Sequence, residues 1–90
     1  MRFEWDPGKA AANQRKHGVG FVDASECLED PLALVLDEPR HADRLILIGL
    51  SRRRRLVFTV YVERDAAVIR IISARRATAR ERRHYEEDDV

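Results

Sequence analysis

The sequence has little of what several classes of small protein require. Its single cysteine, Cys27, cannot form a disulfide within the chain, and no cysteine and histidine residues have the spacing of a zinc site. The four glycines are scattered, which excludes a glycine-rich phosphate loop. No apolar run approaches the roughly 20 residues of a membrane span, and the opening MRFEWD lacks the apolar stretch of a signal peptide. We therefore expect a cytoplasmic domain without a metal or cofactor.

Lysine is also scarce, because every basic residue except Lys9 and Lys16 is arginine. Arginine is the better residue for planar, bidentate recognition of phosphate. Four acidic residues stand together near the end of the chain, in the stretch EEDD, and we interpret residues 87–90 as a short acidic tail. The formal net charge of +1 thus conceals a basic body. Arginine enrichment alone is equally compatible with a well-solvated surface.

Ninety residues predict a single domain that spans residues 1–90. In the first half, the alternation in RFEWD predicts a short strand. Asp6-Pro7 then predicts the start of a helix that ends at Gly18, the residue type best able to adopt the left-handed conformation. A second short helix is predicted over 22–29.

In the second half, three segments rich in β-branched and aromatic residues predict strands at 44–51, 55–63 and 67–73. Their links are short enough for hairpins, so we expect an antiparallel meander, followed by a helix over about 77–87. The fold class is α+β. We expect one face of the sheet to be apolar and covered by helices, and the other to carry Thr59, Tyr61 and Arg70.

Three clusters are candidates for chemistry. The first is Trp5, Lys9, Lys16 and His17, in which Trp5 fits either a core position or a stacking surface for a base. His17 fits a helix end, where cations are favoured, and equally a proton-transfer site. The other two clusters consist of arginines, and either would suit binding of phosphate. One lies in a predicted turn and is Arg52–Arg55. The other lies at a strand-to-helix junction and consists of Arg70, Arg75, Arg76, Arg80, Arg82 and Arg83.

Three stretches in this order resemble the BrnT family of bacterial type II toxins: FEWDPGKAAANQRKHGV, EDPLALVLDEPRHADRLILIG and IRIISARRATARERRHYE. The most specific elements are WD-x-x-K-x-x-x-N-x-x-KHG, RIISAR and E-R-x-x-YE. The resemblance implies a RelE-like fold and a ribonuclease that cuts RNA without a metal and slows translation. It also implies a ribbon-helix-helix antitoxin that neutralises the toxin. The pair would bind operator DNA only through the antitoxin, and no membrane partner is expected.

The same resemblance assigns roles to individual residues. Metal-free cleavage uses the ribose 2′-OH as nucleophile and needs proton transfer and fixed cations around the phosphate. We assign His17 as general acid or base, with Lys9, Arg70 and Arg75 around the phosphate and Tyr85 as a further candidate for proton transfer or stacking. RNA contacts are expected from Trp5, Lys16, Arg53, Arg54, Arg76 and Arg80.

A second hypothesis belongs to another class of function. A catalytically silent module that binds RNA or the antitoxin, and acts as a co-repressor, would use the same basic surface to attract an acidic partner. Both hypotheses predict a hetero-oligomer with an antitoxin, and only RNA cleavage separates them.

Overall fold

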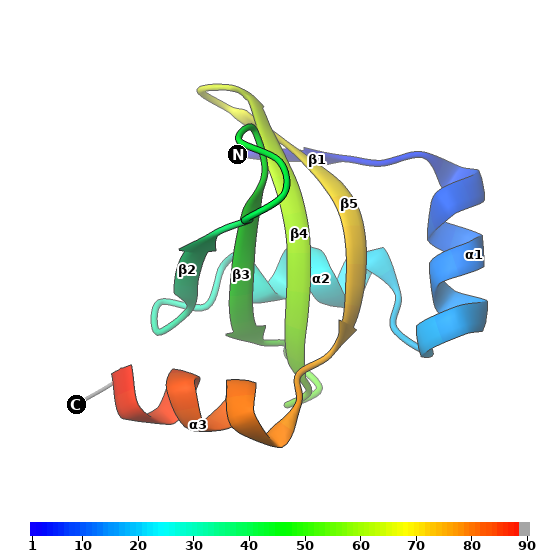
Figure 1. The fold of residues 1–90 in the computed structure, drawn as a ribbon. Helices are drawn as coiled ribbons and strands as arrows, with labels where there is room; N and C mark the ends of the chain where they lie inside the picture. The colour runs from blue at the N-terminus through cyan, green and yellow to red at the C-terminus, as the bar shows by residue number, and fades with distance from the viewer. Residues whose placement is uncertain (89–90) are drawn as a thin grey trace.

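A computed structural model describes residues 1–88 and shows a five-stranded sheet with helices on both faces (Figure 1). Within these residues, no helix has the length and apolar character needed to cross a membrane. The elements in chain order are β1 (Arg2–Glu4), α1 (Pro7–His17), α2 (Phe21–Cys27), β2 (Leu34–Asp37), β3 (Leu45–Leu50), β4 (Leu56–Asp65), β5 (Val68–Arg76) and α3 (Ala79–Asp88).

The sheet has the strand order β1-β5-β4-β3-β2. Strands β2 to β5 are paired antiparallel in succession, so the predicted meander is confirmed and is extended by one strand, β2. The short strand β1 pairs parallel with β5, placing Arg2 opposite Val68 and Glu4 opposite Arg70. The mixed sheet with segregated helices confirms the predicted α+β class.

Helix α1 begins and ends where the sequence predicts. The Asp6 carboxylate accepts hydrogen bonds from the N–H groups of Gly8 (2.8 Å) and Lys9 (3.1 Å), and Pro7 occupies the first helical position. Gly18 adopts the left-handed conformation at φ 70° and donates its N–H to the Gln14 carbonyl. Both ends of α1 are therefore fixed by local interactions.

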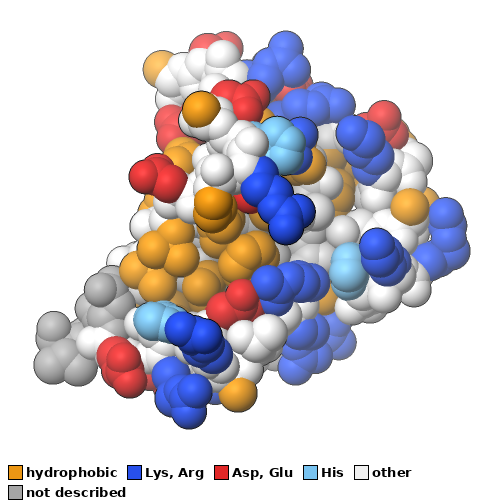
Figure 2. Space-filling view, in the orientation of Figure 1, with side chains coloured by type: hydrophobic (Ala, Val, Ile, Leu, Met, Phe, Trp, Pro, Cys, Tyr) orange, Lys and Arg blue, Asp and Glu red, His pale blue; other side chains and the backbone are white. Residues whose placement is uncertain are grey.

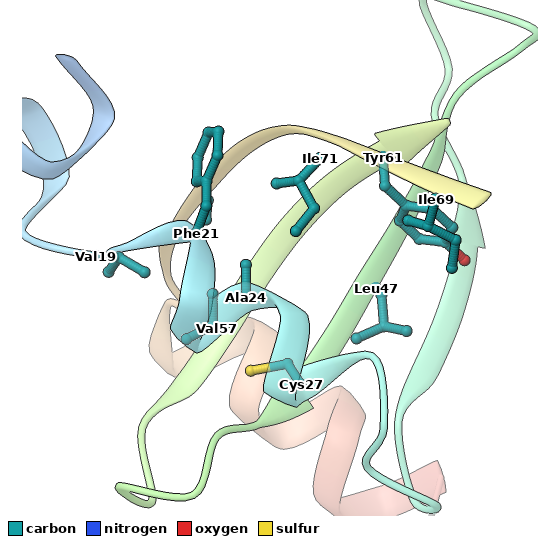
Figure 3. Close-up of a cluster of buried hydrophobic side chains, with 10 residues drawn as sticks. Val19, Phe21, Ala24, Cys27, Leu47, Val57, Tyr61, Ile69 and Ile71 are labelled. Atoms are coloured by element: carbon teal, nitrogen blue, oxygen red, sulfur yellow. The ribbon is translucent and has the colours of Figure 1, made fainter. Parts of the chain in front are cut away.

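One face of the sheet packs against α2 and forms the larger part of the core (Figure 3). Ala24 and Cys27 of α2 are fully buried against Val57 and its neighbours. The approach is close enough that a Cβ on Gly49 would lie 2.7 Å from the Cys27 carbonyl oxygen, which explains a glycine inside β3. Burial, together with nearby carboxylates, raises the pKa of the Cys27 thiol to about 12, so the thiol stays protonated and serves as a core group.

The expectation that Thr59 and Tyr61 share an open face with Arg70 is wrong. Thr59 is 0 % exposed and Tyr61 5 %, and Tyr61 belongs to the cluster under α2. Arg70 lies on the opposite face, in register with Val62. Both faces of β4 carry apolar side chains, so hydrophobicity alone did not indicate which face the helix covers.

The face turned away from α2 carries a second, smaller cluster. Ile46, Ile48 and Leu56 are buried there, and Ala77 and Tyr85 from the C-terminal segment pack against them. The space-filling view shows hydrophobic side chains gathered on this face, with Lys and Arg side chains around them (Figure 2). Helix α3 thus covers only part of the face. Of the predicted acidic tail at 87–90, residues up to Asp88 belong to α3, and residues 89–90 lie outside the described part of the chain.

Candidate functional site

A groove of about 260 Å³ separates α1 from β5. Lys9, Lys16 and His17 line it from the helix, and Ile72 and Ser73 line it from the strand. The structure therefore brings together three of the residues that the sequence singled out, although Lys9 and His17 lie at opposite ends of α1.

The spacing of these residues along α1 explains their common direction. Positions 9, 13, 16 and 17 are three or four apart, and such positions lie above one another on one face of a helix. Lys9, Lys16 and His17 are exposed, whereas Asn13 between them is buried at 8 % exposure. The face of α1 that looks toward β5 is thus basic at both ends and anchored in the middle.

Arg70 lies close to the start of α1. Its guanidinium is 3.5 Å from the Glu4 carboxylate, which also binds Arg64 at 3.2 Å. Backbone hydrogen bonds from Lys9 and Gly8 lower the pKa of Asp6, and the charges of Lys9 and Arg70 act in the same direction. The positive charges of Lys9 and Arg70 therefore both favour the ionised form of Asp6.

Arg75 is held by partners within the fold. Its two terminal nitrogens donate to the two carboxylate oxygens of Glu81, each at 2.8 Å, and its guanidinium stacks 3.9 Å above the Phe58 ring. The hydrogen bonds with Glu81 raise the pKa of Arg75 and lower that of Glu81. Arg75 is therefore a fixed, fully charged group with about a third of its side chain exposed.

Tyr85 points toward a different part of the surface. Its hydroxyl donates to the Asp30 carboxylate at 2.7 Å, beside the loop that follows α2. Burial acts to raise the pKa of Asp30, but hydrogen bonds from Leu50, Leu32 and Tyr85 outweigh it, and the pKa is lowered. The structure does not bring Tyr85 into the groove that Lys9 and His17 line.

Trp5 packs edge-to-face against Phe21, with ring centroids 6.0 Å apart, and is partly buried against the core. This contact accounts for a large aromatic residue at position 5 without a ligand. Because the Trp5 side chain is only partly buried, part of its surface is still accessible to solvent.

The remaining predicted residues gather at one end of the sheet. Arg53 and Arg54 lie in the β3–β4 turn, and pairing of Leu50 with Leu56 and of Val57 with Arg76 places that turn beside the end of β5 (Figure 1). Arg55 donates to the Gly18 carbonyl at 3.5 Å, so the turn also lies against the end of α1. With Arg76 and the exposed Arg80, these residues form an arginine rim, which we define as Arg53, Arg54, Arg76 and Arg80.

The arrangement suits chemistry on an anion. An imidazole exchanges protons near neutral pH, and ammonium and guanidinium groups stabilise negative charge that develops beside it. The groove adds a hydroxyl, that of Ser73, and an apolar wall, Ile72. The arginine rim offers a path for a longer polyanion past the end of α1.

Two polar residues of the groove, Asn13 and Ser73, were not among the candidates from the sequence. Asparagine is unfavourable inside an alanine-rich helix because its side chain competes for backbone hydrogen bonds, so its presence in α1 was a usable signal. Ser73 lies in the RIISAR element of the family resemblance, but its place in the groove depends on how α1 packs on β5.

A sequence model of the family described as the ribonuclease toxin BrnT of type II toxin–antitoxin systems matches residues 5–81. The fold is similar to the crystal structure of the Brucella abortus ribonuclease toxin BrnT, with a TM-score of 0.70 and 30 % identity, covering 87 % of this chain and 97 % of that chain. No curated protein matches. The chain belongs to the BrnT family of ribonuclease toxins of type II toxin–antitoxin systems.

Proposed function

We propose that this chain is a metal-independent endoribonuclease whose active site is the groove between α1 and β5. Membership of the family implies an RNA substrate and an antitoxin partner. The observation that carries the finer proposal is that His17 and Lys16 line one groove, with Lys9 toward its other end. A phosphodiester in this groove meets both a proton carrier and positive charge.

The proposed reaction uses the substrate's own 2′-OH. The 2′-oxygen attacks phosphorus, the bond to the 5′-oxygen breaks, and a 2′,3′-cyclic phosphate forms. His17 either takes the proton from the 2′-OH or gives one to the leaving 5′-oxygen, and water exchanges the other proton. Lys9 and Arg70 stabilise the negative charge that builds on the phosphate oxygens.

Arg75 and Tyr85 take part only if their present contacts change. Arg75 now binds both carboxylate oxygens of Glu81. A phosphate group also presents two oxygens to a guanidinium, so it could replace the Glu81 carboxylate and keep the bidentate geometry. Tyr85 would have to turn from Asp30 to reach a base or a proton. We retain both as candidates of lower rank than His17 and Lys9.

The RNA outside the groove is proposed to follow Lys16 and the arginine rim, with Trp5 as a stacking surface at the other end. Contacts of this kind bind the phosphate chain without reading its sequence. In the cell we propose that the protein acts in the cytoplasm and slows translation. A ribbon-helix-helix antitoxin would neutralise it in a hetero-oligomer, and the pair would repress its own operator through the antitoxin's DNA-binding part.

The test is cleavage of RNA by the purified protein in EDTA, with two substrates. One is an all-ribose oligonucleotide, and the other carries 2′-deoxyribose at each position that is cut in the first. The proposal predicts cleavage of the ribose substrate, 2′,3′-cyclic phosphate ends, and no cleavage of the deoxy substrate. Activity that disappears in EDTA and returns with a divalent metal would contradict metal independence, and cleavage of the deoxy substrate would contradict the 2′-OH as nucleophile.

One observation favours a second candidate, a catalytically silent module that binds RNA or the antitoxin and acts as a co-repressor. Arg70 and Arg75, two of the proposed phosphate ligands, are already paired with Glu4 and Glu81. If the protein binds the deoxy and ribose oligonucleotides equally and cleaves neither, while a control ribonuclease is active, this second candidate replaces the first.

A further inference from the structure

Strand β5 has an edge that no strand covers along its second half. On one side it pairs with β4 as far as Arg76, but on the other side β1 pairs only with Val68, Ile69 and Arg70. Within residues 1–88 no further strand continues that edge. Helix α1 runs alongside it instead (Figure 1).

The Asn13 side chain takes the place of the missing strand. Its amide nitrogen donates to the Ala74 carbonyl at 2.7 Å, and its amide oxygen accepts from the Ala74 N–H at 3.2 Å. The same nitrogen also donates to the Val19 carbonyl at 3.0 Å, just beyond the end of α1. One buried side chain thus satisfies both backbone groups of Ala74, as a neighbouring strand would do.

Ala74 lies next to an irregularity in β5. Val60 is in register with Ser73 and Tyr61 with Ile71, so Ile72 is an extra residue without a partner on β4. Ile72 and Ser73 form the strand side of the groove. On the helix side, Lys9 and His17 each lie four residues, about one turn, from Asn13. The buried contact between Asn13 and Ala74 therefore lies beneath the groove, midway between Lys9 and His17 along α1, and joins the helix to the strand.

We propose that Asn13 is a positioning residue, which sets the separation of α1 from the bulged part of β5 and thereby holds Lys9 and His17 at the reacting phosphate. The inference rests on the proposed function. Asn13 is buried, and its amide is already engaged by the Ala74 and Val19 backbone. Its effect on the reaction acts through the placement of the other two side chains.

Asn13→Ala removes the contact and leaves the chemistry of Lys9 and His17 intact. We expect faster hydrogen exchange at the Ala74 amide and a kcat for RNA cleavage, per folded molecule, at least about tenfold below wild type, because displacements near 1 Å cost this much or more. The matched control is Ile48→Ala, a fully buried residue in the cluster on the opposite face. It also destabilises the fold but is expected to keep kcat within about twofold.

If Asn13→Ala does not fold, Asn13→Gln is the second variant for the same measurements. It keeps the amide but adds one methylene, which moves α1 outward from β5, and the same loss of kcat is expected. Unchanged exchange at Ala74 in a folded Asn13→Ala protein, or a kcat equal to that of the Ile48→Ala control, would overturn the proposal. Absence of cleavage by the wild type would instead refute the proposed function, and the exchange at Ala74 would then decide the contact alone.

Discussion

At the scale of single residues, Thr59 is the one polar side chain of the core that lacks a partner within the described residues. Its hydroxyl is fully buried and makes no hydrogen bond. A buried, unsatisfied hydroxyl costs roughly 1–3 kcal/mol. Replacing it with a methyl group of similar size removes that cost without leaving a cavity.

We therefore expect Thr59→Val to raise the free energy of unfolding by about 1 kcal/mol. Thr78→Val is the matched control, because the Thr78 hydroxyl accepts a hydrogen bond from the Glu81 N–H at the start of α3. That loss of a cap should lower the free energy of unfolding by about 1 kcal/mol. Urea denaturation of both variants measures the two changes, and a destabilised Thr59→Val protein would show that the hydroxyl has a partner in solution.

At the scale of elements, the β3–β4 turn contains a strained residue. Arg54 has φ 64°, and it is the one non-glycine residue with positive φ in the part of the chain that the structure describes. Glycine adopts this conformation without steric cost.

Arg54→Gly should therefore stabilise the protein by about 1 kcal/mol. Arg53→Gly, one residue earlier and outside the left-handed region, removes the same charge but should give no gain in stability. Thermal unfolding of the pair, followed by circular dichroism, tests this; equal shifts in Tm for the two variants would mean that backbone strain at Arg54 is not released.

The start of helix α3 is held by hydrogen bonds that centre on Glu81. Thr78 and Glu81 exchange hydrogen bonds at its first turn, and Glu81 also binds Arg75. The bond from Arg75 holds the pKa of Glu81 below its ordinary value of 4.5. The stabilisation from Glu81 is therefore fully present above pH 4.5 and is lost as the pH falls through the folded-state pKa.

Glu81→Gln should remove this pH dependence. We expect the variant to be less stable than wild type by about 1 kcal/mol at pH 7, and the difference to shrink as the pH is lowered below 4.5. Asp6, Asp30 and Glu38 also have lowered pKa values, so wild type and variant both lose stability in acid, and the comparison between them isolates Glu81. A stability difference that stays constant from pH 7 to pH 3 would contradict the role of its charge.

At the scale of the whole molecule, local signals were sufficient for some features and insufficient for others. Asp6 and Gly18 predicted both ends of α1, because caps depend on a few neighbouring residues. The parallel pairing of Arg2 with Val68 was not predicted, because the two strands are far apart in the chain. The covered face of the sheet was assigned wrongly, since β4 is apolar on both sides.

The candidate site divides in the same way. The resemblance to a known family pointed to His17, Lys9 and Arg70, but the sequence did not show that Asn13 would join α1 to Ala74, which lies 61 positions along the chain. Nor did it show that Glu81 holds Arg75. Residue types suggested which chemistry is available, and packing decided which of those residues face a common groove.

The most direct test of an active site between α1 and β5 is the rate of RNA cleavage in EDTA by wild type, His17→Ala and His84→Ala. His84 is an exposed histidine on α3, so its variant controls for the loss of an imidazole elsewhere on the surface. We expect His17→Ala to fold normally and to lose about 10²–10⁴-fold in rate, the usual contribution of a general acid or base, while His84→Ala keeps the wild-type rate. Equal rates in all three proteins would remove His17 from the chemistry and contradict an active site in the groove between α1 and β5.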